Sequence, residues 1–155
     1  MKLHKKLLLS LIAFFSLLGL GSFNAQAATK QTDAQIRTSI YKQAKANLGK
    51  PYVWGATGAN AFDCSGLTSY VYKKAAKISL PRTADQQYAA SKRIAYRNAK
   101  KGDLVFFGWG GYISHVGIYV GGGKMIDAQN RGVVTEKVVA PWWNYYATAR
   151  VTGLK

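Results

Sequence analysis

The order of hydrophobic patterns along this chain predicts an α+β fold, with N-terminal helices packed on a C-terminal antiparallel β-sheet. Before about residue 90, apolar residues recur every three or four positions, which is the spacing of one helix face. From residue 103 onward, apolar residues form short runs or alternate with polar ones, and glycine-rich turns separate these segments. Helices that precede strands, without an internal repeat, are typical of α+β domains.

Each expected helix begins at a side chain that can cap the free N–H groups of the first turn. These caps are Thr32, Asp63 and Thr83. A glutamine follows each of the two threonines three residues later, which is the spacing of a capping box. Gly49 and Pro51 end the first helix. The helices are therefore expected at residues 33–48, 64–77 and 83–90.

The expected strands are short and follow one another through tight turns. The turn at residues 121–123 consists of three glycines, so it folds one strand back beside its predecessor as a β-hairpin. Residues 108–111 form a second turn or a flexible loop. Strands joined by tight turns pair in the antiparallel sense. They are expected at residues 104–107, 114–120, 124–128, 133–139 and 147–152.

Residues 1–27 have the pattern of a secretory signal peptide. Three lysines precede an apolar run at residues 7–20, and a small-x-small cleavage site follows at residues 25–27. The run is shorter than the ~20 residues that span a membrane. We therefore expect a secreted, extracellular or cell-wall-associated protein. Its mature part, residues 28–155, is expected to be a single catalytic domain and a monomer.

The chain is strongly basic, with 22 Lys and Arg against 6 Asp and Glu and a formal charge of +16. Loss of the three leader lysines lowers this charge to +13. Such a field attracts polyanions, which for a secreted protein are teichoic acids, anionic lipid head groups or acidic glycans. Nucleic acid is not expected, because the basic residues are spread out and no nucleic-acid motif occurs. A solvated basic surface that aids solubility explains the charge equally well.

Cys64 is the only cysteine, and it stands between glycine-rich turns and a helical pattern. Free backbone N–H groups and the positive end of the helix dipole favour a thiolate at such a position. A lone cysteine is otherwise most often a small buried hydrophobe. The polar neighbours Asp63 and Ser65, together with Gly66, favour a nucleophile instead.

His115 is the only histidine left after removal of the leader, so any imidazole base for Cys64 must be His115. The hairpin places Asp127 roughly alongside His115, where a carboxylate would hold the imidazole in one tautomer. The alternatives are a structural histidine and a solvent-exposed carboxylate. One cysteine and one histidine leave no intramolecular disulfide and too few ligands for a zinc site, so no metal or other cofactor is expected.

An oxyanion formed beside the nucleophile needs hydrogen-bond donors. The backbone N–H of Cys64 is one candidate, and the hydroxyl of Tyr52 on the preceding segment is another. Tyr52 could equally be a packing residue. Four loop residues are further candidates for the lining of a cleft: Trp54, Arg82, Thr83 and Trp109.

A series of sequence blocks occurs in this order: PYVWG, FDCSGL, LPRT followed by a glutamine, GDLVFF, SHVGIYVG and MIDAQ. Over about residues 33–152, these blocks resemble the NlpC-type cysteine peptidases. The resemblance implies a papain-like α+β fold, with the nucleophile at a helix start and the base on the sheet. It also implies hydrolysis of bacterial cell-wall peptide stems, typically at the bond from the γ-carboxyl of D-glutamate to the following diamino acid.

Carried over by position, the resemblance implies that Cys64 is the nucleophile, His115 the base and Asp127 the orienting group. Tyr52 matches a tyrosine near the oxyanion site. The residues expected to hold the stem peptide are Asp63, Ser65 and Thr83. The family commonly has histidine at the third position, so this chain is expected to use a Cys-His-Asp triad instead.

Two other functions stay open at this point. One is a non-catalytic wall-binding protein, which would need neither Cys64 nor its partners. The other is an acyltransferase or amidase on the same scaffold, because thiolate attack and an acyl-enzyme are common to both chemistries. Many relatives carry separate wall-binding modules. None is expected here, and attraction of the basic surface to anionic wall polymers is expected to replace them.

Overall fold

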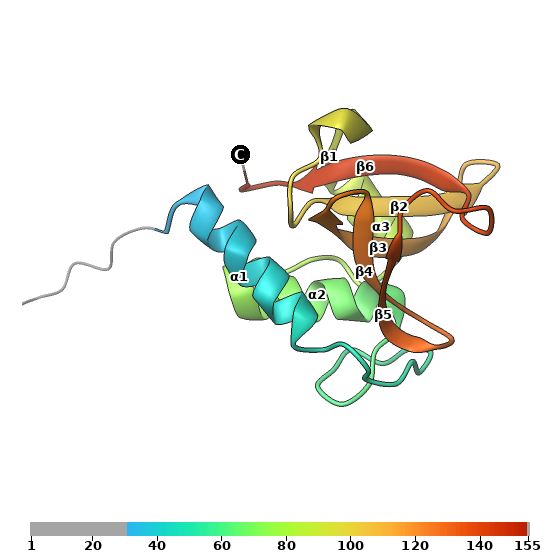
Figure 1. Cartoon of the computed structure of the whole chain (residues 1–155), viewed down its shortest axis with the longest axis horizontal. Coiled ribbons are helices and arrows are strands. Elements are labelled where there is room, and N and C mark those ends of the chain that lie inside the picture. The colour runs from blue at the N-terminus through green and yellow to red at the C-terminus, as the bar shows by residue number, and fades with distance from the viewer. Residues whose placement is uncertain (1–30, 155) are drawn as a thin grey trace, which may run out of the picture. The chain divides into compact units, whose positions relative to one another are not determined.

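The computed structural model describes residues 31–154, and the signal peptide expected at residues 1–27 lies outside the described residues. Within the described part, three helices precede a six-stranded sheet (Figure 1). No helix of residues 31–154 is long and apolar enough to cross a bilayer. The expected α+β arrangement is therefore confirmed.

The sheet has the strand order β1-β6-β2-β3-β4-β5, and every neighbouring pair is antiparallel. Its strands are β1 (Ser91–Ile94), β2 (Leu104–Trp109), β3 (Tyr112–Gly121), β4 (Lys124–Gln129), β5 (Gly132–Lys137) and β6 (Tyr145–Val151). The last strand in the chain lies between β1 and β2, so long-range pairing joins the two halves of the sheet.

β1 was not expected from the sequence, nor was the short 3₁₀ turn at Tyr96–Asn98. The strand consists of only four residues, and two adjacent basic residues hide any alternation of apolar and polar positions. It pairs with β6 alone and forms one edge of the sheet. Its exposed basic side chains also discourage pairing with a second chain. The turn expected at residues 108–111 is shorter than expected. β2 continues through Trp109, so only residues 110 and 111 join it to β3.

The helices are α1 (Asp33–Lys45), α2 (Cys64–Ala76) and α3 (Ala84–Ala89). All three expected caps are present: Thr32 and Thr83 form capping boxes, and the Asp63 carboxylate accepts a hydrogen bond from the N–H of Gly66. α1 ends three residues before the expected position. The chain turns there because Gly49 N–H donates to the carbonyl of Val133 on β5, at 2.9 Å.

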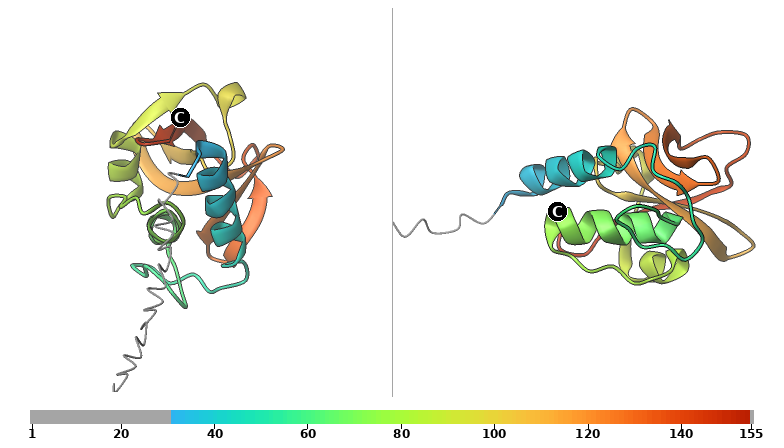
Figure 2. Two further views of the ribbon diagram at one scale, coloured as in Figure 1. Left: turned by 90° about the vertical axis from the view of Figure 1, so that its left-hand side faces the viewer. Right: turned by 90° about the horizontal axis from the view of Figure 1, so that it is seen from below.

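The main core lies between the helices and one face of the sheet, and Figure 2 gives two further views of these elements. Ile40 of α1 and Leu67 of α2 are fully buried against Phe106 and Ile118 of the sheet. A smaller cluster, which includes Phe107 of β2, covers the other face. The catalytic candidates lie where the start of α2 meets the sheet, so this core determines their positions.

A buried ion-pair network joins α1 to the sheet. Asp103, just before β2, is fully buried and accepts hydrogen bonds from Arg37 of α1 and from Arg150 of β6, at 2.9–3.0 Å. Removal of a buried carboxylate would leave both guanidinium groups poorly compensated, which costs about 3–5 kcal/mol in such networks. The network therefore holds the two layers together at the end remote from Cys64.

Candidate active site

Cys64 is the first residue of α2 and is only 9% exposed. The preceding Asp63 holds the loop and the helix together through both carboxylate oxygens. Its Oδ1 accepts from Gly66 N–H at 2.6 Å, and its Oδ2 accepts from Gly55 N–H at 3.0 Å. The thiol is therefore presented at the positive end of a capped helix, which is the setting that the sequence predicts.

Gly66 allows the loop before Cys64 to lie directly against the helix start. A Cβ at Gly66 would lie 2.1 Å from the carbonyl oxygen of Ala56 and 2.9 Å from Oδ1 of Asp63. The same Ala56 carbonyl accepts a hydrogen bond from Asp63 N–H at 2.9 Å. Only glycine leaves space for this contact, so Gly66 positions the segment that carries the thiol.

His115 on β3 and Asp127 on β4 meet across the predicted hairpin. Nε2 of His115 and Oδ2 of Asp127 are 2.8 Å apart, and Asp127 is fully buried. Gly117 leaves room for the carboxylate, because a Cβ there would lie 3.2 Å from Cβ of Asp127. The structure thus places the expected carboxylate in contact with the expected base.

The thiol of Cys64 also interacts with the imidazole of His115, and this interaction raises the pKa of the imidazole. Because Asp127 engages Nε2, Nδ1 is the ring nitrogen left for this interaction. Burial lowers the pKa of His115, but the interactions with Asp127 and Cys64 outweigh it and raise the pKa to about 9. The imidazole is therefore cationic at neutral pH.

Trp143 stacks on the imidazole, with ring centroids 4.5 Å apart and 15° between the planes. Phe107 contacts both rings, at 4.8 Å from Trp143 and 5.8 Å from His115. These contacts hold the imidazole in the plane in which it meets both Cys64 and Asp127. Sequence reasoning missed Trp143, because nothing in the local sequence indicates that this segment packs against His115 on β3.

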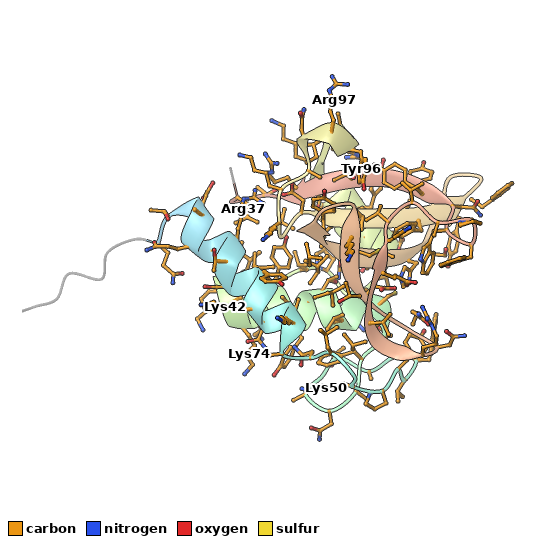
Figure 3. The ribbon with its side chains drawn as sticks, viewed as in Figure 1. Arg37, Lys42, Lys50, Lys74, Tyr96 and Arg97 are labelled. Carbon is orange, nitrogen blue, oxygen red and sulfur yellow. The ribbon has the colours of Figure 1, made fainter. Side chains whose placement is uncertain are left out.

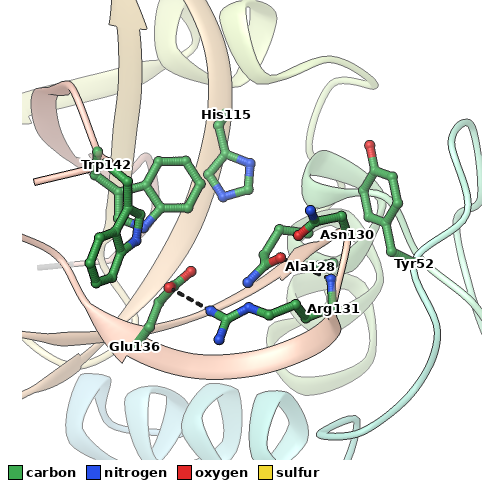
Figure 4. A pocket seen from close by; sticks show the side chains of 9 residues that line it. Tyr52, His115, Ala128, Asn130, Arg131, Glu136 and Trp142 are labelled. Carbon is green, nitrogen blue, oxygen red and sulfur yellow. Dashed lines mark hydrogen bonds and ion pairs between the residues drawn. The ribbon is translucent and has the colours of Figure 1, made fainter. Parts of the chain in front are cut away.

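His115 and Cys64 face two different hollows. The first has a volume of about 540 Å³ and is lined by His115 and Tyr52 (Figure 4). Its other lining residues are Ala128, Gln129, Asn130, Arg131, Glu136, Trp142 and Trp143. The second hollow, of about 320 Å³, is lined by Cys64 and the residues around its helix start. An extended ligand bound across the thiol can therefore reach into both.

Tyr52 lies on the side of the first hollow away from Trp142 (Figure 4). Burial raises the pKa of its hydroxyl, and the charges of Cys64 and Asp63 raise it further. The hydroxyl therefore stays protonated at neutral pH and can donate a hydrogen bond.

Arg82 has a role that sequence reasoning did not assign. Its guanidinium pairs with both carboxylate oxygens of Asp63, and its Nη1 donates to the Ser65 hydroxyl at 3.0 Å. Asp63 and Ser65 are 6% and 4% exposed, so these contacts occupy most of their polar surface. Both residues line the second hollow, but their observed contacts hold the helix start in place.

The remaining candidates lie at the rim. Thr83 caps α3 and its hydroxyl hydrogen-bonds Asp85, while its exposed side lines the second hollow with Trp54. Trp109 is 75% exposed and lines neither hollow, so the structure does not bring it to the site. Among residues 31–154, no three His, Cys, Asp or Glu side chains gather in a group that could hold a metal ion.

With this geometry established, comparison with known proteins identifies the family. The model of the NlpC/P60 family matches residues 49–152, a range that contains every candidate residue discussed above. This chain belongs to the NlpC/P60 family. The resemblance carried by the sequence blocks is thereby confirmed.

Two curated relatives are named as peptidases. The chain is 53% identical over 107 residues to "Probable endopeptidase p60" of Listeria monocytogenes, a match that covers 69% of this chain and 22% of the relative. It is 42% identical over 109 residues to "Bifunctional muramidase/DL-endopeptidase CwlT" of Bacillus subtilis, which covers 68% and 33%. The chain spans about a quarter of the length of the Listeria relatives that it matches.

A solved structure of similar length shows that this NlpC/P60 fold also serves a second purpose. RipD of Mycobacterium tuberculosis superposes with a TM-score of 0.65 and 28% identity, over 76% of this chain and 98% of that chain. It is described as a non-catalytic NlpC/p60 domain protein adapted to peptidoglycan binding. The papain-like α+β fold expected from the sequence is confirmed, and the family includes both peptidases and a binding protein.

Proposed function

We propose that this protein is a thiol endopeptidase that hydrolyses the peptide stems of bacterial peptidoglycan, with Cys64, His115 and Asp127 as its catalytic triad. The observation that supports this most directly is the contact of one imidazole with both other groups. His115 lies 2.8 Å from Asp127, and its interaction with the Cys64 thiol raises the pKa of the imidazole. A protein that only binds the wall requires neither contact.

The reaction begins when the Cys64 thiolate attacks the carbonyl carbon of the scissile bond. The developing oxyanion accepts hydrogen bonds from Cys64 N–H and from the Tyr52 hydroxyl. The C–N bond then breaks as imidazolium His115 gives its proton to the leaving amine, and a thioester remains. His115 next takes a proton from water, and the resulting hydroxide attacks the thioester. The C–S bond breaks, the acid is released, and thiolate and imidazolium are restored.

The bond that we propose joins the γ-carboxyl of D-glutamate to the following diamino acid. The sequence blocks around Cys64 and His115 support this choice, as does the DL-endopeptidase name of the Bacillus subtilis relative. The acyl part of the stem would lie in the second hollow, beside Asp63, Ser65 and Thr83. The leaving amine must lie close to His115, so the diamino acid would occupy the first hollow.

We further propose that the protein is secreted, acts as a monomer at the cell wall, and uses its positive charge to associate with anionic wall polymers. The leader-like pattern at residues 1–27 supports secretion. The formal charge of +13 that remains without the three leader lysines supports attraction to polyanions.

Digestion of purified peptidoglycan by the protein and by its Cys64→Ala variant tests the proposed function. We expect the unmodified protein to release fragments cut after D-glutamate, as read by mass spectrometry. The variant should lose activity by roughly 10³-fold or more, because it lacks the nucleophile. His115→Ala should lose activity similarly, since residues that act as a unit are not additive.

The RipD likeness makes a binding protein the second candidate, and the same samples distinguish the two. If the unmodified protein and Cys64→Ala both bind peptidoglycan but neither cuts it or a free stem peptide, the endopeptidase proposal is wrong. Products in which the acyl group has been transferred to an amine, and not to water, would instead identify an acyltransferase that uses the same thiol.

A further inference from the structure

Glu136 on β5 faces the same side of the sheet as the carboxylate of the proposed triad. The strand register pairs Glu136 with Met125, and it pairs Asp127 with Val134. Glu136 and Asp127 are therefore diagonal neighbours on adjacent strands, a separation that long side chains can bridge. The side chain of Glu136 is only 8% exposed, and it lines the hollow that His115 also lines.

Each of the two carboxyl groups has one oxygen that accepts no hydrogen bond from residues 31–154. Oδ2 of Asp127 bonds His115, and Oε2 of Glu136 pairs with Arg131 at 3.1 Å (Figure 4). Oδ1 of Asp127 and Oε1 of Glu136 are buried and have no donor among the described residues. The two carboxyl groups interact with one another, because the charge of Asp127 raises the pKa of Glu136.

We infer that Glu136 is a positioning residue for the thiol–imidazole pair, because its negative charge acts with that of Asp127 to stabilise imidazolium His115. When Glu136 is protonated, it adds no negative charge behind the imidazole. When that proton leaves, a second negative charge appears behind the imidazole. The inference rests on the proposed thiol mechanism and assigns to it a residue from a neighbouring strand.

The charged groups around Glu136 have opposing effects on it. Burial raises the pKa of Glu136, as does the charge of Asp127 on β4, whereas Arg131 in the β4–β5 turn lowers it. Arg131 is 63% exposed, so solvent screens its effect more than that of the buried Asp127. His115 on β3 contacts Asp127 and lines the same hollow as Glu136. Once ionised, Glu136 therefore adds a second negative charge near the imidazole.

The test is the titration of His115 in Glu136→Gln, a variant of nearly the same shape that lacks the charge. The imidazole resonance is followed by NMR, with His115→Gln used to assign it. In parallel, the alkylation rate of Cys64 by the uncharged reagent iodoacetamide is measured against pH. We expect the midpoint of the His115 titration and the alkaline midpoint of the alkylation profile to fall by about one pH unit relative to the unmodified protein. Glu136→Asp keeps the charge, so its midpoints should lie close to those of the unmodified protein.

Two controls separate this effect from a general disturbance. Arg131→Gln removes a positive charge beside the same carboxyl, so it should move the midpoint upward or leave it in place. Asp33→Asn removes a distant negative charge at the start of α1 and should have no effect. An unchanged or higher midpoint in Glu136→Gln overturns the inference, as does a fall of equal size in Arg131→Gln.

Neither readout requires a substrate, so the result is independent of peptidoglycan cleavage. If Glu136→Gln does not fold, the test uses Arg131→Gln, which changes an exposed side chain. A lowered His115 midpoint in Arg131→Gln contradicts the proposal that negative charge at Glu136 stabilises the imidazolium. If the protein cleaves no peptidoglycan but the midpoints shift as expected, the proposed function fails while the electrostatic role of Glu136 stands.

Discussion

His115 depends on Asp127 for both its orientation and its charge. The carboxylate is fully buried, so its interaction with the imidazole is little screened by water. The same contact raises the pKa of His115 to about 9, although burial alone would lower it. A histidine is the common third residue in this family, whereas a carboxylate contributes a full negative charge to the imidazolium.

Replacement of Asp127 by Asn tests this dependence. The amide keeps the shape of the side chain but removes the charge and allows the wrong imidazole tautomer. We expect kcat/KM on stem peptides to fall by roughly 10²–10⁴-fold. The alkaline limb of the pH profile should move from about 9 toward lower pH, because a less stabilised imidazolium loses its proton earlier. A profile with an unchanged alkaline limb would show that Asp127 does not carry this role.

At the scale of elements, the start of α2 and the β3–β4 hairpin each hold one half of the site. Asp63, Arg82 and Ser65 tie the helix start to its two flanking loops, and the hairpin holds the base against its carboxylate. The thiol and the imidazole meet only because these two elements pack together. A small displacement of α2 would therefore impair the reaction more than it impairs the fold.

Gly66→Ala provides such a displacement. The added Cβ would collide with the Ala56 carbonyl, which is backbone and cannot rotate away. We expect a loss of about 1–3 kcal/mol of unfolding free energy, measured by urea denaturation. Activity should fall by a larger factor than the decrease in the folded fraction, because the protein stays folded while the thiol is displaced. Lys73→Ala, an exposed change on the same helix, is the control and should leave stability within about 0.5 kcal/mol. Full activity in Gly66→Ala would contradict the positioning role.

At the scale of the whole molecule, the excess of positive charge is distributed over many elements. Basic side chains extend from α1, the loop after it, α2 and the 3₁₀ turn, as Lys42, Lys50, Lys74 and Arg97 show in Figure 3. A distributed charge of this kind gives long-range attraction to a polyanion without a specific binding pocket.

Retention on cell walls should therefore depend on salt. We expect binding of the inactive Cys64→Ala variant to peptidoglycan that retains its anionic polymers to weaken strongly between about 0.05 and 0.5 M salt, because the Debye length shortens several-fold. Walls stripped of these polymers serve as the matched control and should bind less at low salt. Binding that is equal on both walls and insensitive to salt would contradict electrostatic retention.

The features that the sequence alone determined are those encoded by neighbours in the chain. Capping residues set the starts of α1, α2 and α3, and a three-glycine turn set the hairpin that pairs Asp127 with His115. Cys64 and His115 could be paired by elimination, since residues 28–155 contain no other cysteine or histidine.

Only the tertiary structure decided the contacts between distant segments. The pairing of Arg82 with Asp63, the stacking of Trp143 on His115 and the placement of Glu136 diagonally opposite Asp127 follow from the packing of separate loops and strands. The β1 edge strand, which lies beside β6 at the far end of the chain, has the same origin. Local patterns do not encode such contacts, because burial of apolar surface over the whole domain selects which segments meet.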